Sequence, residues 1–409
     1  MATIGENLSM ASSFGWLDND DEQRRRMLEV VDLFREQGTI DELGIGSIRD
    51  TLANAMFPGT STLHTRLRYV LFLPWLMRDA SHKRNPNEMG AEFRNMQYRL
   101  TESLLAGGEN EGVMGNVARR NLKRLPGDVY WSALRSWGLV DATSPDAYYR
   151  RLADFRALKQ RTAEPDDVDA FTALATDGID PDLPPPAPDL LRRADFALTP
   201  HEEEYLKDRI ATRTRGTLLA WLVINQPTNA SGADAANFPW EIANRDELPE
   251  DLGTTVEHAR RFSEIVQGAA LVYNLALARR AGRDEVADRH AESLALWQDT
   301  SAPDDARSWD RADWWALITR HNPQLRSTTR DFIERWIELA GSGAELLTSD
   351  QAARLVENRE RQIKGARARF VNQAALDRWS GSSGLGRLDF RWGNSIVHLR
   401  DLYAARAAA

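Results

Sequence analysis

Apolar residues in this chain recur every three or four positions, and this spacing constrains the fold more than any other feature. In residues 21–38, Met27, Val30 and Phe34 share one face of a helix, and Gly38 provides a stop at its C-terminal end. Segments that alternate between apolar and polar residues and end in hairpin turns are almost absent. The same helical spacing recurs in residues 150–161, 202–225, 256–282 and 330–341. The sequence therefore predicts a mainly α-helical fold.

Residues 163–190 are acidic and rich in proline. They contain eight Asp or Glu residues and six prolines but no Lys or Arg, so they account for most of the chain's net charge of −9. Because proline fixes φ and lacks an N–H, this composition is typical of a stiff, extended connector. We therefore predict two helical lobes, residues 1–162 and 191–409, joined by an acidic Pro-rich connector. A long surface loop that crosses a single domain is the alternative.

The absence of cysteine excludes disulfides, thiolate nucleophiles and cysteine metal sites, and it is typical of proteins from a reducing cytoplasm. The first residues lack the basic and continuous apolar regions of a signal peptide. The best apolar run, YVLFLPWLM, has nine residues and is too short to span a membrane. We expect a soluble cytoplasmic protein without membrane contact.

Familiar catalytic and cofactor motifs are not found. The seven histidines form no HExxH pair, and His201 with the three acids after it predicts an acidic first helical turn following Thr199–Pro200. The glycine-rich residues 380–387 lack the GK[ST] ending of a phosphate loop, and there is no GxSxG or Rossmann fingerprint. The sequence therefore predicts no metal and no cofactor, and it favours a non-catalytic role.

The stretch GTSTLHTRLRYVLFLPWLMRD, residues 59–79, combines polar residues with large apolar side chains. We expect a helix that begins near Ser61 or Thr62. One interpretation is a core helix with arginines at its edge. The other is an anion-binding site at the helix N-terminus, formed by Thr62, His64 and Arg66.

The C-terminal region carries the strongest surface signal. Residues 348–379 predict one long helix that opens with a Thr348–Gln351 capping box. Val356, Ile363 and Phe370 recur every seven residues and form an apolar stripe. We expect the basic residues Arg354, Arg361 and Lys364 to lie opposite this stripe and to reach solvent.

Residues 351–400 contain ten basic and four acidic residues, an excess that suits contact with phosphate groups or with an acidic partner. An ordinary solvated helix face is the alternative. Trp379, Phe390 and Trp392 lie among these arginines, where they could stack on bases or belong to the core. The candidate nucleic-acid-binding residues are Arg354, Arg361, Lys364, Arg367, Arg369, Arg387 and Arg391.

Residues 38–76, GTIDELGIGSIRDTLANAMFPGTSTLHTRLRYVLFLPWL, together with FGWLD before them and GRLDFRWGN near the C-terminus, carry a resemblance over the whole chain. The chain resembles an uncharacterised bacterial family, a domain of unknown function, whose members have about the length of this chain. The resemblance implies an occurrence in phage-defence gene clusters, beside helicase and phospholipase-D-like nuclease proteins. It supplies no catalytic residue.

Together these features predict a non-catalytic subunit of a bacterial anti-phage defence complex. Such a subunit would contact nucleic acid, with DNA as one candidate, or a helicase or nuclease partner, or both. Two alternatives stay open. One is a nuclease whose site is assembled from carboxylates that are distant in the sequence, and the other is a purely structural scaffold.

Overall fold

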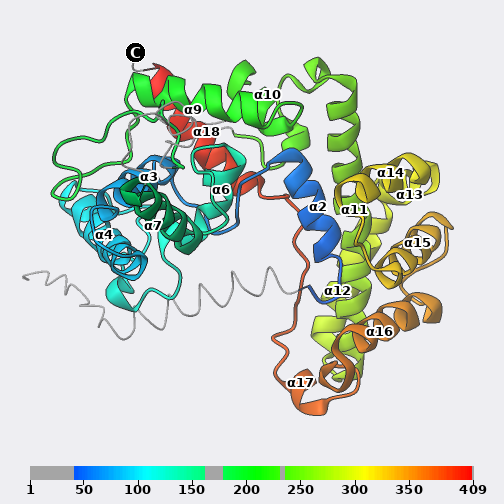
Figure 1. The fold of residues 1–409 in the computed structure, drawn as a ribbon. Coiled ribbons are helices and arrows are strands. Elements are labelled where there is room, and N and C mark those ends of the chain that lie inside the picture. The colour runs from blue at the N-terminus through cyan, green and yellow to red at the C-terminus, as the bar shows by residue number, and fades with distance from the viewer. Residues whose placement is uncertain (1–40, 162–177, 231–234, 408–409) are drawn as a thin grey trace, which may run out of the picture. The chain divides into compact units, whose positions relative to one another are not determined.

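The computed structural model describes residues 41–161, 178–230 and 235–407 of the chain, drawn as coloured ribbon in Figure 1. Within these ranges the regular structure is helical and no β-strand occurs; Val140 and Ile179 form an isolated antiparallel bridge. The predicted mainly α-helical class is therefore confirmed. The helix predicted within residues 21–38 lies outside the described ranges.

The first half of the chain forms helices of very different lengths. Asn85 caps α4, because its side chain accepts a hydrogen bond from the Glu88 N–H at 3.0 Å and Pro86 occupies the first turn. The helices are α2 (Gly46–Met56), α3 (Tyr69–Ala80), α4 (Pro86–Ala106), the 3₁₀ turn η1 (Arg119–Asn121), α5 (Pro126–Val129), α6 (Trp131–Ser136) and α7 (Pro145–Arg161).

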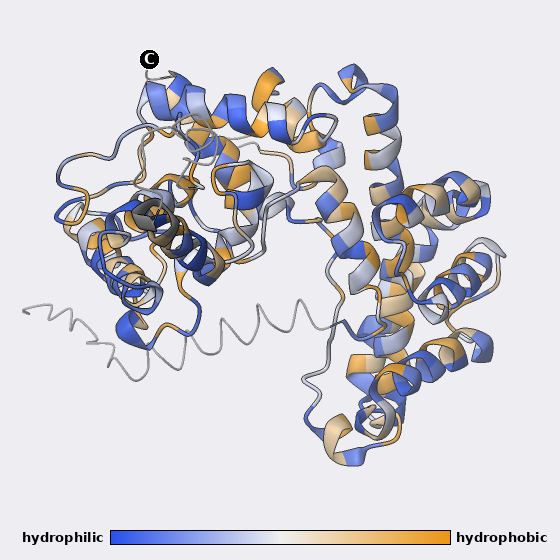
Figure 2. Cartoon of the chain, in the orientation of Figure 1, coloured by the Kyte–Doolittle hydropathy of each residue, from blue (hydrophilic) through white to orange (hydrophobic). Residues whose placement is uncertain are grey.

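The second half contains α11, the longest of the described helices. Nearly every residue from 268 to 278 of α11 is buried, because α2, α12, α13, α15 and α16 all pack against this helix. On most other helices, hydrophobic and hydrophilic stripes alternate around the ribbon (Figure 2). The helices are α9 (Pro200–Arg213), α10 (Leu218–Asn225), η3 (Pro239–Glu241), η4 (Arg245–Glu247), α11 (Glu250–Arg280), α12 (Asp284–Gln298), α13 (Ala302–Ser308), α14 (Arg311–His321), α15 (Ser327–Gly341), α16 (Asp350–Lys364), η5 (Gly365–Arg367), α17 (Gln373–Asp377) and α18 (Trp392–Ala407).

Residues 178–190, the second part of the predicted connector, contain no helix. The buried Asp180 carboxylate accepts a hydrogen bond from the Tyr205 hydroxyl at 2.9 Å and pairs with Arg209. The Trp75 indole N–H donates to the Pro184 carbonyl at 2.7 Å. This part of the connector is therefore packed against α3 and α9. Residues 162–177 lie outside the described ranges, and the division into two lobes stays a prediction.

The aromatic residues near the glycine-rich C-terminal loop belong to the core. Trp379, Phe390 and Trp392 are at most 2% exposed. The Trp392 indole N–H donates to the Ala236 carbonyl at 2.7 Å. These rings are therefore not available to stack on bases. Among the described helices, none combines the length and the apolar character needed to cross a bilayer.

Candidate nucleic-acid interface

The long C-terminal helix ends earlier than the sequence predicts. Ser349, rather than Thr348, caps α16, with its hydroxyl oxygen accepting from the Ala352 N–H at 3.1 Å. The helix stops at Lys364 because Gly365 adopts a positive φ of 55°. The prediction of one helix over residues 348–379 is therefore wrong, and Phe370 lies beyond the end of α16.

The predicted apolar stripe and its opposite face also differ from expectation. Val356 and Phe370 are buried, but Ile363 is 39% exposed. Lys364 does not reach freely into solvent. Its ammonium group pairs with the carboxylates of Glu42 and Glu360, which are 4% and 0% exposed.

Lys364 and Arg369 belong to one neutral cluster of two cations and two carboxylates. Arg369 donates to Glu42 at 2.7 Å and to the Tyr273 hydroxyl at 2.9 Å. Tyr273 in turn donates to Glu360 at 2.7 Å. Burial opposes ionisation of Glu360, but hydrogen bonds from Tyr273 and Lys364 hold its pKa below the ordinary value. This cluster joins α11, α16 and residue 42, so its two cations have a structural role.

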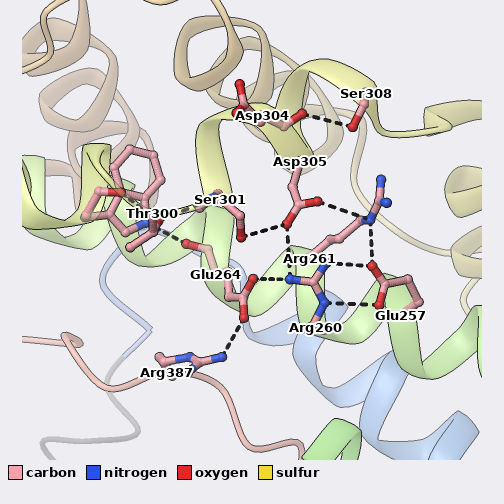
Figure 3. A network of polar contacts seen from close by, with 12 residues as sticks. Glu257, Arg260, Arg261, Glu264, Thr300, Ser301, Asp304, Asp305, Ser308 and Arg387 are labelled. Carbon is pink, nitrogen blue, oxygen red and sulfur yellow. Dashed lines mark hydrogen bonds and ion pairs between the residues drawn. The ribbon is translucent and has the colours of Figure 1, made fainter. Parts of the chain in front are cut away.

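Arg387 belongs to a second charge network, shown in Figure 3. It pairs with Glu264 at 2.7 Å, and its guanidinium lies 4.3 Å from the centre of the Phe238 ring. Arg260 joins Glu264 to Glu257 and Asp305 (Figure 3). The network fastens α11 to α13 and to the C-terminal segment.

The carboxylates of this network have different proton affinities. Burial tends to raise the pKa of Glu257, but hydrogen bonds from Arg260 and Arg261 lower that pKa to about 2. Burial raises the pKa of Glu264 above its ordinary value, although Arg260 and Arg387 oppose the shift. Glu257 is therefore firmly ionised and can hold its arginines at any ordinary pH.

Arg391 is also occupied by the fold. Its guanidinium donates to the Asn54 side chain at 2.7 Å and to the Thr60 carbonyl at 2.9 Å. Burial lowers the pKa of Arg391. Arg391 thus holds the segment after α2 against the start of α18.

Four of the ten basic residues of this region remain exposed on α16 and the segment after it. Arg354 and Arg361 are seven residues apart, so they lie on one face of α16, with side chains 75% and 44% exposed. Each faces a carboxylate one turn before it, Asp350 or Glu357. Arg367 and Arg378 are exposed beyond the helix.

The anion-binding site predicted at Thr62, His64 and Arg66 does not lie at a helix N-terminus, because α3 begins only at Tyr69. Thr62 is exposed, whereas His64 is 3% exposed and its Nε2 lies 3.1 Å from the Val129 carbonyl oxygen. Burial lowers the pKa of His64 to about 4. Its neutral ring stacks on Tyr130 at 4.1 Å.

Arg66 faces a different partner. Its guanidinium pairs with Asp401 of α18 at 2.8 Å, and the same carboxylate accepts from the Leu67 N–H at 2.8 Å. Burial raises the pKa of Asp401, although Arg66 opposes the shift. The structure therefore does not bring Thr62, His64 and Arg66 together. It uses Arg66 to fasten the start of α3 to α18.

A basic loop, residues 119–124, includes η1 and was not predicted from the sequence. Residues 112–127 contain four basic residues and no acidic residue, and all four basic side chains are exposed. The local charge count could have found this loop. It is shorter than the C-terminal region and carries a smaller total excess.

Within the described ranges, no three His, Asp or Glu side chains are grouped as a metal ion requires. The fold and its surfaces thus define a helical protein with internal charge networks and exposed basic surfaces. The profile of a family described as a family of unknown function (DUF6361) matches residues 11–406, and the chain belongs to this family. No curated protein and no solved structure matches the chain.

Proposed function

We propose that this protein is a non-catalytic subunit of a bacterial anti-phage defence complex and that it contacts nucleic acid. The observation that carries the contact is the exposed arginine face of α16, formed by Arg354 and Arg361 and continued by Arg367 and Arg378. The defence context comes from the resemblance described above.

The surroundings of these arginines suit an exchange of carboxylate for phosphate. Exposed ion pairs such as Arg354–Asp350 contribute only about 0–1 kcal/mol, so a phosphate can replace the carboxylate at little cost. Arg354 and Arg361 are two turns apart, about 10 Å along the helix, so both can touch one nucleic-acid backbone.

A triple variant, R354A/R361A/R367A, tests the contact. Its affinity for DNA or RNA of any sequence should fall, and the log–log salt slope should shrink by up to about 0.9 for each lost contact to duplex DNA. Lys364 is left unchanged, because it belongs to the buried cluster with Glu42 and Glu360. Unchanged affinity in the folded variant would contradict the proposed contact.

Co-purification from the native operon tests the subunit role. We expect helicase or nuclease proteins encoded nearby to be recovered with the wild-type chain. If they are recovered while no nucleic acid is bound, the protein is a scaffold. If the purified protein cleaves nucleic acid in the presence of Mg²⁺, the nuclease alternative replaces the proposal.

A further inference from the structure

The basic loop, residues 119–124, carries four cations that are not paired with carboxylates of the described chain. Its members Arg119, Arg120, Lys123 and Arg124 are all exposed. Within the described ranges, none of them forms an ion pair with a carboxylate. This distinguishes the loop from the C-terminal region, where most cations are paired.

Both ends of the segment that carries the basic loop are fixed to the protein. The Met114 N–H donates to the Tyr69 hydroxyl at 2.9 Å, and the Thr101 hydroxyl donates to the Met114 carbonyl at 3.0 Å. At the other end, the Gly127 N–H donates to the Gln97 side chain at 2.7 Å. The cations are therefore presented by a preorganised loop, and a ligand need not supply the free energy to order it.

The backbone of the basic loop is strained at Arg119. Its φ is +48°, and its N–H donates to the Gly115 carbonyl at 2.8 Å. The left-handed conformation costs a residue with a side chain about 1–2 kcal/mol, a cost that glycine avoids. An arginine at such a position is an observation that suggests a function for its side chain.

Helix α4 extends the same basic surface. The Arg120 guanidinium lies over the Tyr98 ring, 5.6 Å from its centre. Arg94, one turn before Tyr98 on the same face of α4, is exposed. One acid, the exposed Glu102, follows Tyr98 by one turn.

The acids that flank the basic loop leave its charge largely intact. Asp128, which follows the loop, accepts a hydrogen bond from the Leu125 N–H at 3.2 Å. Glu109 and Glu111, which precede it, both interact electrostatically with Arg66, and Glu109 also accepts from the Phe196 N–H at 2.8 Å. Within the described ranges, none of these three carboxylates forms an ion pair with a loop cation.

We propose that the basic loop, with Arg94 of α4, binds the phosphate backbone of a nucleic acid. Guanidinium groups match phosphate geometry, and several unpaired cations on one fixed surface provide the sequence-independent part of nucleic-acid binding. This site is separate from the arginine face of α16, and it can bind whether or not that face does.

The test compares two variants of the full-length protein that lose the same charge. R119A/R120A/K123A/R124A removes the loop cations, and R150A/R193A/R280A/R289A removes four exposed arginines scattered over other helices and loops. Fluorescence anisotropy with labelled duplex DNA, duplex RNA and single strands measures affinity at several salt concentrations. We expect the loop variant to bind at least about tenfold more weakly at about 0.1 M salt, with a smaller salt slope, and the scattered variant to change less than about twofold.

Further outcomes are decisive as well. R119K/R120K/R124K keeps the charge and should retain most of the binding, and a thermal melt of the alanine variant checks that it is folded. Equal losses in the loop and scattered variants, wild-type affinity in the loop variant, or no binding by the wild-type protein would overturn the proposal. If the loop variant alone loses poly-glutamate binding but keeps its nucleic-acid binding, the proposal is also overturned. That result would indicate an acidic protein partner.

The R354A/R361A/R367A variant separates this proposal from the proposed function. If only that variant loses nucleic-acid affinity, the α16 face binds and the basic loop does not. If only the loop variant loses affinity, the reverse holds.

Discussion

The C-terminal region, residues 351–400, and the basic loop are both rich in Lys and Arg, but their cations have different surroundings. In the C-terminal region, Lys364, Arg369 and Arg387 contact carboxylates supplied by residue 42, α11 and α16. In the basic loop, all four cations face solvent. The contrast teaches that a charge count along the chain does not measure surface charge, because the fold can place a distant carboxylate beside each cation.

The largest expected effect is in the buried cluster of the C-terminal region. Glu360→Gln removes a fully buried charge that faces Lys364, and it should lower the free energy of unfolding by about 3 kcal/mol. Glu357→Gln, on the same helix, breaks only the exposed pair with Arg361 and should cost less than about 1 kcal/mol. Denaturant titration of both variants checks the difference, and equal costs would remove the distinction between the two kinds of cation.

The next effect is the pH dependence of stability that arises from two buried imidazoles, His64 of the predicted anion-binding site and His398. Burial lowers the pKa of His64 to about 4 and that of His398, which is fully enclosed, well below its ordinary value of 6.5. The unfolded chain protonates both imidazoles below pH 6.5, whereas the folded chain protonates His64 only near pH 4 and keeps His398 neutral well below its ordinary pKa. The stabilisation is therefore complete above pH 6.5 and is lost as the pH falls towards 4, and about 2 kcal/mol of the His64 contribution is lost by pH 5.

His398→Leu checks the assignment of this pH dependence. Neither ring nitrogen of His398 has a hydrogen-bond partner among the described residues, so the substitution breaks no hydrogen bond found there. Between pH 6 and 5, the slope of unfolding free energy against pH should decrease by an amount that corresponds to the uptake of about one proton on unfolding. An unchanged slope would show that the acid sensitivity arises elsewhere.

A smaller effect separates the partly buried Arg387 from the exposed Arg354. Arg387→Ala removes the contacts with Glu264 and Phe238 and should lower the free energy of unfolding by about 1–2 kcal/mol. Arg354→Ala should change stability by less than about 0.5 kcal/mol. Thermal melts and anisotropy titrations of both variants are informative together: a loss of nucleic-acid affinity in R387A at full stability would reverse the structural interpretation of Arg387.

The smallest effect is expected in the basic loop itself. Arg119→Gly relieves the strained left-handed backbone, and it should raise the free energy of unfolding by about 0.5 kcal/mol despite the greater freedom of glycine in the unfolded chain. Arg120→Gly, at a neighbouring residue without a positive φ, should not stabilise the protein. Calorimetric melting of the two variants makes the comparison.

Features that depend on local spacing could be predicted from the sequence. The helical class and the acidic first turn of α9 were predicted correctly, the latter because Thr199 and Glu202 form a capping box within one turn. The burial of Trp379 and Trp392 agrees with the core alternative.

The errors arise where distant residues determine the outcome. The segment before α3 does not become helical, and the Tyr130 hydroxyl and Asp401 take the N–H groups of residues 65–67 instead. No local signal at residues 61–68 reveals these partners. The pairing of Lys364 with Glu42 spans more than three hundred residues, and only the tertiary structure shows it.

The contact between Arg66 and Asp401 also has a consequence for synthesis of the chain. The two residues are 335 positions apart. A ribosome that adds about 5–20 residues per second reaches Asp401 roughly 17–70 seconds after Arg66. During that interval the Arg66 side chain and the Leu67 N–H have to be satisfied by water or by a chaperone. The junction of α3 and α18 can therefore close only after α18 has left the ribosome.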